Sequence, residues 1–140
     1  DQFINTMVFN HAEQEKPRHG GRNWVKIPFY SAVERIQCFR AKAEKYICVF
    51  MYFNGVGGLE AYEKIMDKWS EFESSLPGLE HSISSHGFPE IFIKHSVDIT
   101  DESTVEEQLT WLRETSNKFV DIFGPVFEAI ERDERRDKKI

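Results

Sequence analysis

The chain has few cysteines and no long apolar run. These two features argue against a disulfide-stabilised protein and against a membrane-spanning protein. Its two cysteines, Cys38 and Cys48, are too few for a disulfide framework, and each lies in an apolar, strand-like segment. We therefore expect two buried free thiols and a cytoplasmic location. No segment approaches the roughly 20 apolar residues that a membrane-spanning helix needs. No membrane partner is expected.

The sequence also lacks the short motifs of common catalytic sites. No serine stands in a Gly-x-Ser-x-Gly motif, and no Gly-Lys-Ser/Thr follows a glycine loop. Nucleases of the PD-(D/E)XK class need Glu-x-Lys or Gln-x-Lys on a central strand, and the only match, Gln14-Glu-Lys16, precedes a loop. His81, His86 and His95 have no cysteines near them and form no ligand pattern. We predict no catalytic residue, no metal and no cofactor, and an enzyme is the less favoured interpretation.

Abundant aromatic residues indicate a folded domain. Twelve of the 140 residues are Phe, which argues against disorder. The length fits one domain, 1–140, that ends in a charged tail, 131–140. Because the sequence starts at Asp1 rather than at an initiator Met, we consider it a C-terminal fragment of a longer protein.

The apolar periodicity predicts the secondary structure. Period-2 alternation or short apolar runs indicate strands, and apolar residues spaced by three and four indicate helices. Strands are expected at 24–30, 35–40, 46–53, 82–84 and 91–98, and helices at 3–14, 59–76 and 104–132. Short connections between successive strands favour antiparallel pairing. The predicted fold is α+β, with a mostly antiparallel sheet of four to five strands, two main helices packed on it and a short N-terminal helix.

The residues of two predicted strands indicate where each strand lies in the sheet. Segment 46–53 is apolar at every position, which is typical of a central strand buried on both faces. Pro28 lacks an amide donor, so segment 24–30 is expected at an edge of the sheet or at a bulge.

Basic residues gather in the N-terminal third. Residues 1–50 carry eight basic and five acidic groups, net +3, whereas residues 51–130 carry five basic and fifteen acidic groups, net −10. The basic cluster lies beside Trp24 and consists of Lys16, Arg18, His19, Arg22 and Lys26, of which the four Lys and Arg residues are the candidate contacts. Cations around an aromatic ring can contact a phosphate backbone and stack a base. This cluster is the candidate nucleic-acid site; the alternative is a polar loop leading into a strand whose Trp24 is packed.

A glycine-rich loop, Asn54-Gly-Val-Gly-Gly58, links the apolar strand to a helix. Such a loop can present amides to a phosphate. However, the dinucleotide motif needs glycine where Glu60 stands, and Glu60 and Glu63 would repel a phosphate. A plain turn is favoured, and an aromatic pocket near 54–58 is kept as the site of a small-ligand-binding or enzymatic alternative.

The last helical segment, 104–132, is apolar over more than one stripe. Most of its apolar residues are assigned to the core against the sheet. The surplus lies beyond Gly124-Pro125, at Val126, Phe127 and Ile130, which we predict to form an interaction surface.

The order of these aromatic segments resembles a known family. The residues concerned are Arg22-Asn-Trp24, the strand 46–53, the helix with Leu59, Ile65, Trp69 and Phe72, Gly87, the strand 91–97, and Trp111-Leu-x₆-Phe119-Val-x₂-Phe123-x-Pro125. They are similar to bacterial and archaeal domains of unknown function that often lie C-terminal to restriction-endonuclease-like regions. The resemblance implies a non-catalytic accessory module of a nuclease or defence protein. It supplies no catalytic residues, and this sequence carries no nuclease-like half.

Three functions are therefore open. The first is an accessory or interaction domain that binds a partner domain or a second copy of itself. The second is a DNA- or other nucleic-acid-binding module that uses the loop 16–26. The third is the small-ligand or enzymatic domain with a pocket near 54–58.

Overall fold

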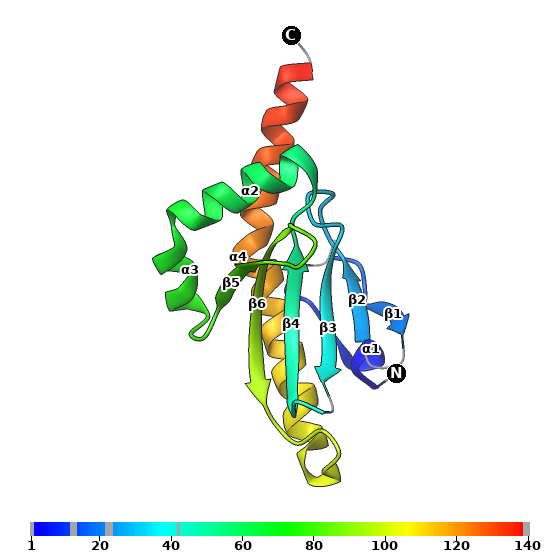
Figure 1. Cartoon of the computed structure of the whole chain (residues 1–140). Helices are drawn as coiled ribbons and strands as arrows, with labels where there is room; N and C mark the ends of the chain where they lie inside the picture. Colours follow the sequence, from blue (N-terminus) through cyan, green and yellow to red (C-terminus); the bar gives the residue numbers. More distant parts are fainter. Residues whose placement is uncertain (1, 12–13, 22–23, 42, 139–140) are drawn as a thin grey trace.

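The computed structural model of the chain describes residues 2–11, 14–21, 24–41 and 43–138. In chain order its elements are α1 (Gln2–Thr6), β1 (Arg18–Gly21), β2 (Trp24–Pro28), β3 (Arg35–Ala41), β4 (Tyr46–Tyr52), α2 (Gly55–Asp67), α3 (Trp69–Ser75), β5 (Glu80–Ile83), β6 (Pro89–Ser96), a 3-10 turn η1 (Glu102–Thr104) and α4 (Val105–Lys138). Figure 1 shows α4 running the length of the molecule behind the sheet. The predicted α+β class is confirmed.

Among the described residues the sheet has six strands, all paired antiparallel, in the order β1-β2-β3-β4-β6-β5. The strand missing from the prediction is β1, which lies in the segment interpreted as a loop. It pairs with β2 through Arg18 opposite Lys26, and its register shifts between His19 and Gly21. Its Gly-Gly pair is thus part of an irregular edge strand rather than a turn.

β4 lies inside the sheet between β3 and β6, as predicted, but it is not buried on both faces. Ile47, Val49 and Met51 are fully buried, whereas Tyr46, Phe50 and Tyr52 stay partly exposed. The prediction of double burial was wrong because an apolar run does not reveal whether a second layer covers the sheet.

Pro28 ends β2, which is the second strand and not the edge. β1 pairs with β2 only as far as Lys26. No residue of β1 therefore lies opposite Pro28 to accept a backbone hydrogen bond from this position. The Pro28 carbonyl accepts instead from the Gln14 side chain, with Nε2 to O 2.6 Å. The absence of an amide at residue 28 therefore costs no sheet hydrogen bond on that side.

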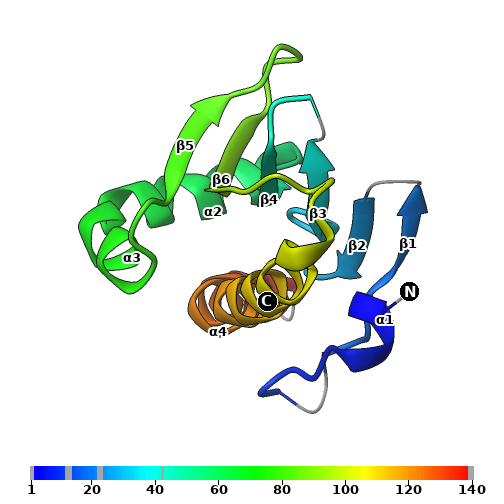
Figure 2. The ribbon, with the colours of Figure 1, turned by 90° about the horizontal axis from the view of Figure 1, so that it is seen from below.

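The helices gather on one side of the sheet. Figure 2 shows α4 with α1 and α3 beside it on this side, and no helix over the opposite side within the part of the chain that the structure describes. The predicted helix 59–76 begins earlier, at Gly55, and divides at Lys68 into α2 and α3. In the same described part, no helix has the length and apolarity needed to span a membrane.

The core lies between α4 and the inward sheet face. It includes Ile27, Ile36, Val49, Met51 and Ile91 from the strands and Phe119, Phe123 and Phe127 from α4. α4 continues through Gly124 and Pro125 and includes residues 131–138 of the charged tail, ending at Lys138.

The predicted interaction surface at the end of this helix is wrong for two of its three residues. Phe127 is 1% exposed and Ile130 is 3% exposed, and only Val126 is partly open. Phe127 packs against Phe29 (ring centroids 5.4 Å apart) and Tyr30 (5.7 Å) from the turn after β2. That turn covers the surplus apolar face, so the surplus belongs to the core.

Candidate functional site

The uncovered side of the sheet carries a set of aromatic and charged side chains. Successive strand residues face opposite sides, and Cys38 faces α4 because its Sγ lies 3.2 Å from Ser116 Oγ. Its neighbours Gln37 and Phe39 therefore face away from the helices. We call this surface the open face; it is formed by Trp24, Lys26, Arg35, Gln37, Phe39, Tyr46, Cys48, Phe50, Tyr52, Glu80, Ser82, Glu90, Phe92 and Lys94.

Strand register arranges the open face in rows, since residues paired across neighbouring strands share a face. One row reads Trp24, Phe39, Cys48, Lys94 from β2 to β6. The next row reads Lys26, Gln37, Phe50, Phe92, Glu80 from β2 to β5. The third contains Arg35 on β3, then Tyr52, Glu90 and Ser82.

Aromatic rings form the middle of the open face. Phe39 meets Phe50 edge to face with centroids 5.3 Å apart, and it meets Tyr46 at 5.9 Å. Phe50 meets Tyr52 at 4.9 Å. These rings surround a shallow hollow of about 180 Å³, and each keeps part of its surface open. An exposed surface rich in aromatic rings is typical of a binding interface, because burying it against a partner removes apolar area from water.

Charges flank the rings with opposite signs at the two sides. Lys26 on β2 and Arg35 on β3 lie on one side, with the Arg35 guanidinium 5.5 Å from the Trp24 ring centre. Glu80 on β5 and Glu90 on β6 lie on the other, where Glu90 Oε1 accepts from Ser82 Oγ at 2.6 Å. Lys94 is the exception, since its Nζ lies on the acidic side, 4.7 Å from the Tyr46 ring centre.

The predicted nucleic-acid cluster is only partly assembled. Arg18 and Lys26 are cross-strand partners at the basic end of the open face. Lys16 is exposed just before β1, and Arg22 lies outside the described residues. Arg18 Nη2 is paired with Glu15 Oε1 at 3.0 Å, which reduces its positive field. Sequence reasoning missed Arg35, because only the β2–β3 pairing brings it to this cluster.

The Trp24 ring lies over the backbone of its own hairpin. A Cβ built on Gly20 would stand 2.3 Å from the ring, so glycine is needed where the indole crosses β1. Trp24 is half-buried and flanked by Arg35. It is thus packed on one side and open on the other, between the two alternatives that the sequence left open.

The glycine loop 54–58 is explained by backbone geometry. Gly55 has φ +65°, a conformation that favours glycine, and a Cβ on Gly58 would meet the Ala32 carbonyl oxygen at 2.8 Å. A hollow of about 200 Å³ lies here, between Asn54–Gly57, Tyr30 and Phe127. It lies where the sequence suggested an aromatic pocket, and it is small.

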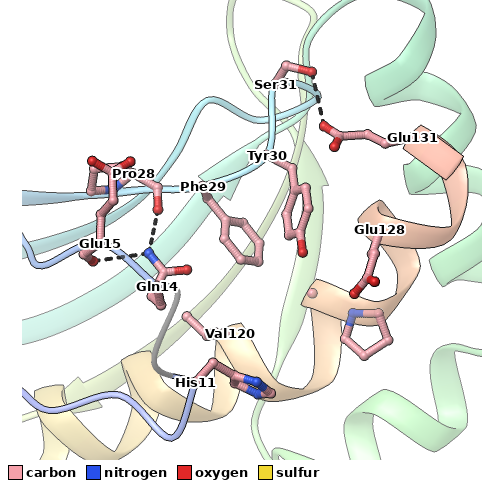
Figure 3. Close-up of a pocket in the computed structure, with 12 residues that line it drawn as sticks. His11, Gln14, Glu15, Pro28, Phe29, Tyr30, Ser31, Val120, Glu128 and Glu131 are labelled. Carbon is pink, nitrogen blue, oxygen red and sulfur yellow. Dashed lines mark hydrogen bonds between the residues drawn. The ribbon is translucent and has the colours of Figure 1, made fainter. Parts of the chain in front are cut away.

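A larger cleft of about 390 Å³ adjoins this hollow on the other side of Tyr30 and Ser31. Figure 3 shows the side chains around it, which come from the N-terminal segment, the turn after β2 and α4. Its lining residues include Phe29, Tyr30, Gly124, Pro125 and Glu128. Sequence reasoning missed the cleft because its three walls are far apart in the chain.

The surroundings of the two thiols and of His81 and His95 indicate packing roles rather than catalytic ones. Burial raises the pKa of Cys38 and of Cys48 to about 12, so neither thiol is a reactive nucleophile at neutral pH. His81 packs against Trp69 at 4.7 Å, and His95 stacks on Trp111 at 5.3 Å. Within the described ranges, no three His, Cys, Asp or Glu side chains come close enough together to hold a metal ion.

Comparisons with known proteins add little to this geometry. No protein-family model matches the chain, and no curated protein matches its sequence. Among solved structures, the chain is similar to YbjN from E. coli, a protein proposed to be a transcription regulator, at 14% identity and a TM-score of 0.49, over 94% of this chain and 89% of that one. At these values the likeness carries no argument about this chain.

Proposed function

We propose that the chain is a non-catalytic interaction domain that pairs with a second copy of itself through the open face. The observation that carries the proposal is the set of partly exposed rings on β3, β4 and β6, flanked by cations on one side and carboxylates on the other. Aromatic residues and arginine are enriched at protein interfaces, and a sheet face packs well on another sheet about 10 Å away.

The charge pattern favours a second copy as the partner. A two-fold axis along β4, in the plane of the interface, places β2 of one copy over β5 of the other and β3 over β6. Lys26 then faces Glu80 within one row, and Arg35 faces Glu90 within the next. Phe39 faces Lys94 in the first row, which suits a cation–π contact. Each contact occurs twice, because the symmetry repeats it.

The decisive test is the oligomeric state across a concentration series, measured by light scattering and sedimentation equilibrium. We expect a dimer that Phe50→Glu dissociates. The matched control is Val56→Glu, which places the same side chain at an 87% exposed apolar position in α2 and should leave the dimer intact. A strictly monomeric wild type at high concentration contradicts the proposal.

A charge-reversal pair tests the symmetry axis itself. Lys26→Glu and Glu80→Lys should each weaken dimerisation about tenfold, since facing like charges cost of the order of 1.4 kcal/mol or more. The two changes combined in one chain should restore the dimer, because the axis brings these positions together. Failure of the double variant to recover contradicts this axis.

A second candidate function is nucleic-acid binding at the basic end of the open face. It is favoured by Arg35 and Lys26 lying beside the half-open Trp24 ring. A single-stranded oligonucleotide should then bind with a log–log salt slope of about −0.7 per phosphate contacted. Lys26→Ala should reduce that slope by about one contact; an unchanged affinity would exclude this site.

The biological setting is part of the proposal and rests on the family resemblance. A self-pairing accessory domain would join two nuclease-bearing or defence-associated chains. We place it in the cytoplasm, in keeping with the two buried free thiols.

A further inference from the structure

The cleft beside Tyr30 has the features of a ligand site that is independent of the open face. It lies on the helix side of the sheet, between α4, the turn after β2 and the residues His11, Gln14 and Glu15. Its volume of about 390 Å³ is within the range of small-molecule pockets, roughly 300–1,000 Å³. Phe29, Tyr30, Val120 and Pro125 supply apolar wall.

The charged groups around the cleft are mainly negative. Glu15, Glu128 and Glu131 line it, and its described lining contains no lysine or arginine. Glu15 is engaged by Arg18, and Glu131 Oε1 lies 3.5 Å from Ser31 Oγ. Glu128 has no hydrogen-bond or ion-pair partner among the residues that the structure describes, and Figure 3 shows its carboxylate beside the Tyr30 side of the cleft.

The cleft's basic group is already paired. His11 Nε2 lies 2.9 Å from Asp121 Oδ1. Asp121 in turn accepts from the Asn10 side-chain amide at 2.8 Å. The imidazole is thus held at the wall by α4, and the carboxylates dominate the field in the cleft.

Gly124 and Pro125 give the α4 wall two further properties. Pro125 adds apolar surface to the wall. Gly124 leaves the space of a side chain open, since a Cβ there would approach only the Tyr30 ring, at 4.0 Å. The wall therefore combines apolar surface, open volume and an aromatic ring.

We propose that this cleft binds a primary ammonium group carried on a short apolar chain. The ammonium donates to the Glu128 carboxylate, and the chain packs on Tyr30 and Phe29, whose ring faces also attract a cation. Such a group occurs at the end of a lysine side chain and in free alkyl amines. An anion is disfavoured, because the Glu128 carboxylate repels it.

The test uses the full chain and n-butylammonium as the probe, titrated while amide chemical shifts are followed by NMR. We expect saturable shifts at Tyr30, Gly124 and Glu128, and no such shifts with butyrate or n-pentanol. Equal shifts from the neutral or anionic analogue would overturn the proposal, because they would indicate an apolar hollow without charge selection.

Two variants make the test specific. Glu128→Gln should weaken butylammonium binding about tenfold, as expected for the loss of one charged hydrogen bond. Glu114→Gln, the same change at an exposed position of α4, is the control and should have no effect. Gly124→Ala fills part of the cleft without a clash and should also weaken binding. Unchanged affinity in Glu128→Gln overturns the proposal.

The source of the ammonium is decided by two further probes. A blocked Gly-Lys-Gly peptide that binds more tightly than butylammonium indicates a partner's lysine, whereas tighter binding of putrescine indicates a free amine. Both outcomes support an ammonium site. Binding of neither probe, with butylammonium also silent, refutes it whatever the oligomeric state of the chain.

Discussion

Cys38 Sγ and Ser116 Oγ lie 3.2 Å apart and form a polar contact inside the otherwise apolar interface between β3 and α4. Both side chains are buried, at 3% and 0% exposure. Ser116→Ala should lower the free energy of unfolding by about 0.5–1.5 kcal/mol, the usual net value of such a bond. Urea denaturation measures the loss. A double-mutant cycle with Cys38→Ala should show coupling between the two sites, and strict additivity would contradict the contact.

The same burial predicts that both thiols are inert in the folded chain. Because burial raises the pKa of Cys38 and Cys48 to about 12, a thiol reagent at pH 8 should label neither. In urea both thiols should react at once. Labelling of the native chain at the unfolded rate would contradict the buried positions.

Raised thiol pKa values also set a pH dependence of stability. Above the ordinary thiol pKa of 9.0, the unfolded chain ionises while the folded chain stays protonated, so stability falls as the pH rises from 9 toward 12. The loss is at most about 1.4 kcal/mol per pH unit for each thiol. The control is the Cys38→Ala, Cys48→Ala chain, in which the contribution of the two thiols is absent. Equal pH slopes in the two chains would contradict the prediction.

Two helical glycines should respond in opposite ways to alanine. At Gly58 a Cβ would stand 2.8 Å from the Ala32 carbonyl oxygen and 2.9 Å from the Phe53 carbonyl carbon, both backbone atoms that cannot yield. Gly58→Ala should therefore cost about 1–3 kcal/mol. Gly124→Ala meets nothing closer than 4.0 Å and should stabilise α4 by roughly 0.5–1 kcal/mol. Thermal or urea unfolding of the pair provides the comparison.

The absence of a side chain at Gly20 leaves the space that the Trp24 ring occupies over β1. Because a Cβ at Gly20 would stand 2.3 Å from the indole, Gly20→Ala should push Trp24 off β1 and open the basic end of the open face. We expect a red-shifted component in the tryptophan emission. Trp24→Phe serves as the reference for that signal, since it removes the residue without crowding β1. An unchanged emission spectrum would show that the ring does not lie over Gly20.

Local patterns predicted the elements because they depend only on neighbours along the chain. The alternation in 91–98 and 35–40 gave β6 and β3, and the 3.6-residue spacing gave α2 and α4. Such patterns do not predict the strand register, which depends on how segments far apart in the chain pair. It is the register that places Lys26 opposite Gln37 and Phe50 opposite Phe92, and so builds the open face.

Local patterns also do not predict whether a particular apolar side chain, such as Phe127 or Phe50, is buried. Phe127 was expected at a surface because α4 is apolar over more than one stripe, and it is buried because Phe29, Tyr30 and Phe53 converge on it from other elements. Conversely, Phe50 was expected in a doubly buried strand and is partly exposed.

By itself the sequence determined which residues are apolar, at what spacing, and therefore which segments become strands and helices. Only the tertiary structure decided which apolar faces are covered, since that depends on contacts between segments far apart in the chain. The helices of the described part of the chain lie on one side of the sheet, so Phe127 is buried and the Phe39–Phe50 surface stays open. The same arrangement forms the cleft beside Glu128, between α4 and the turn after β2.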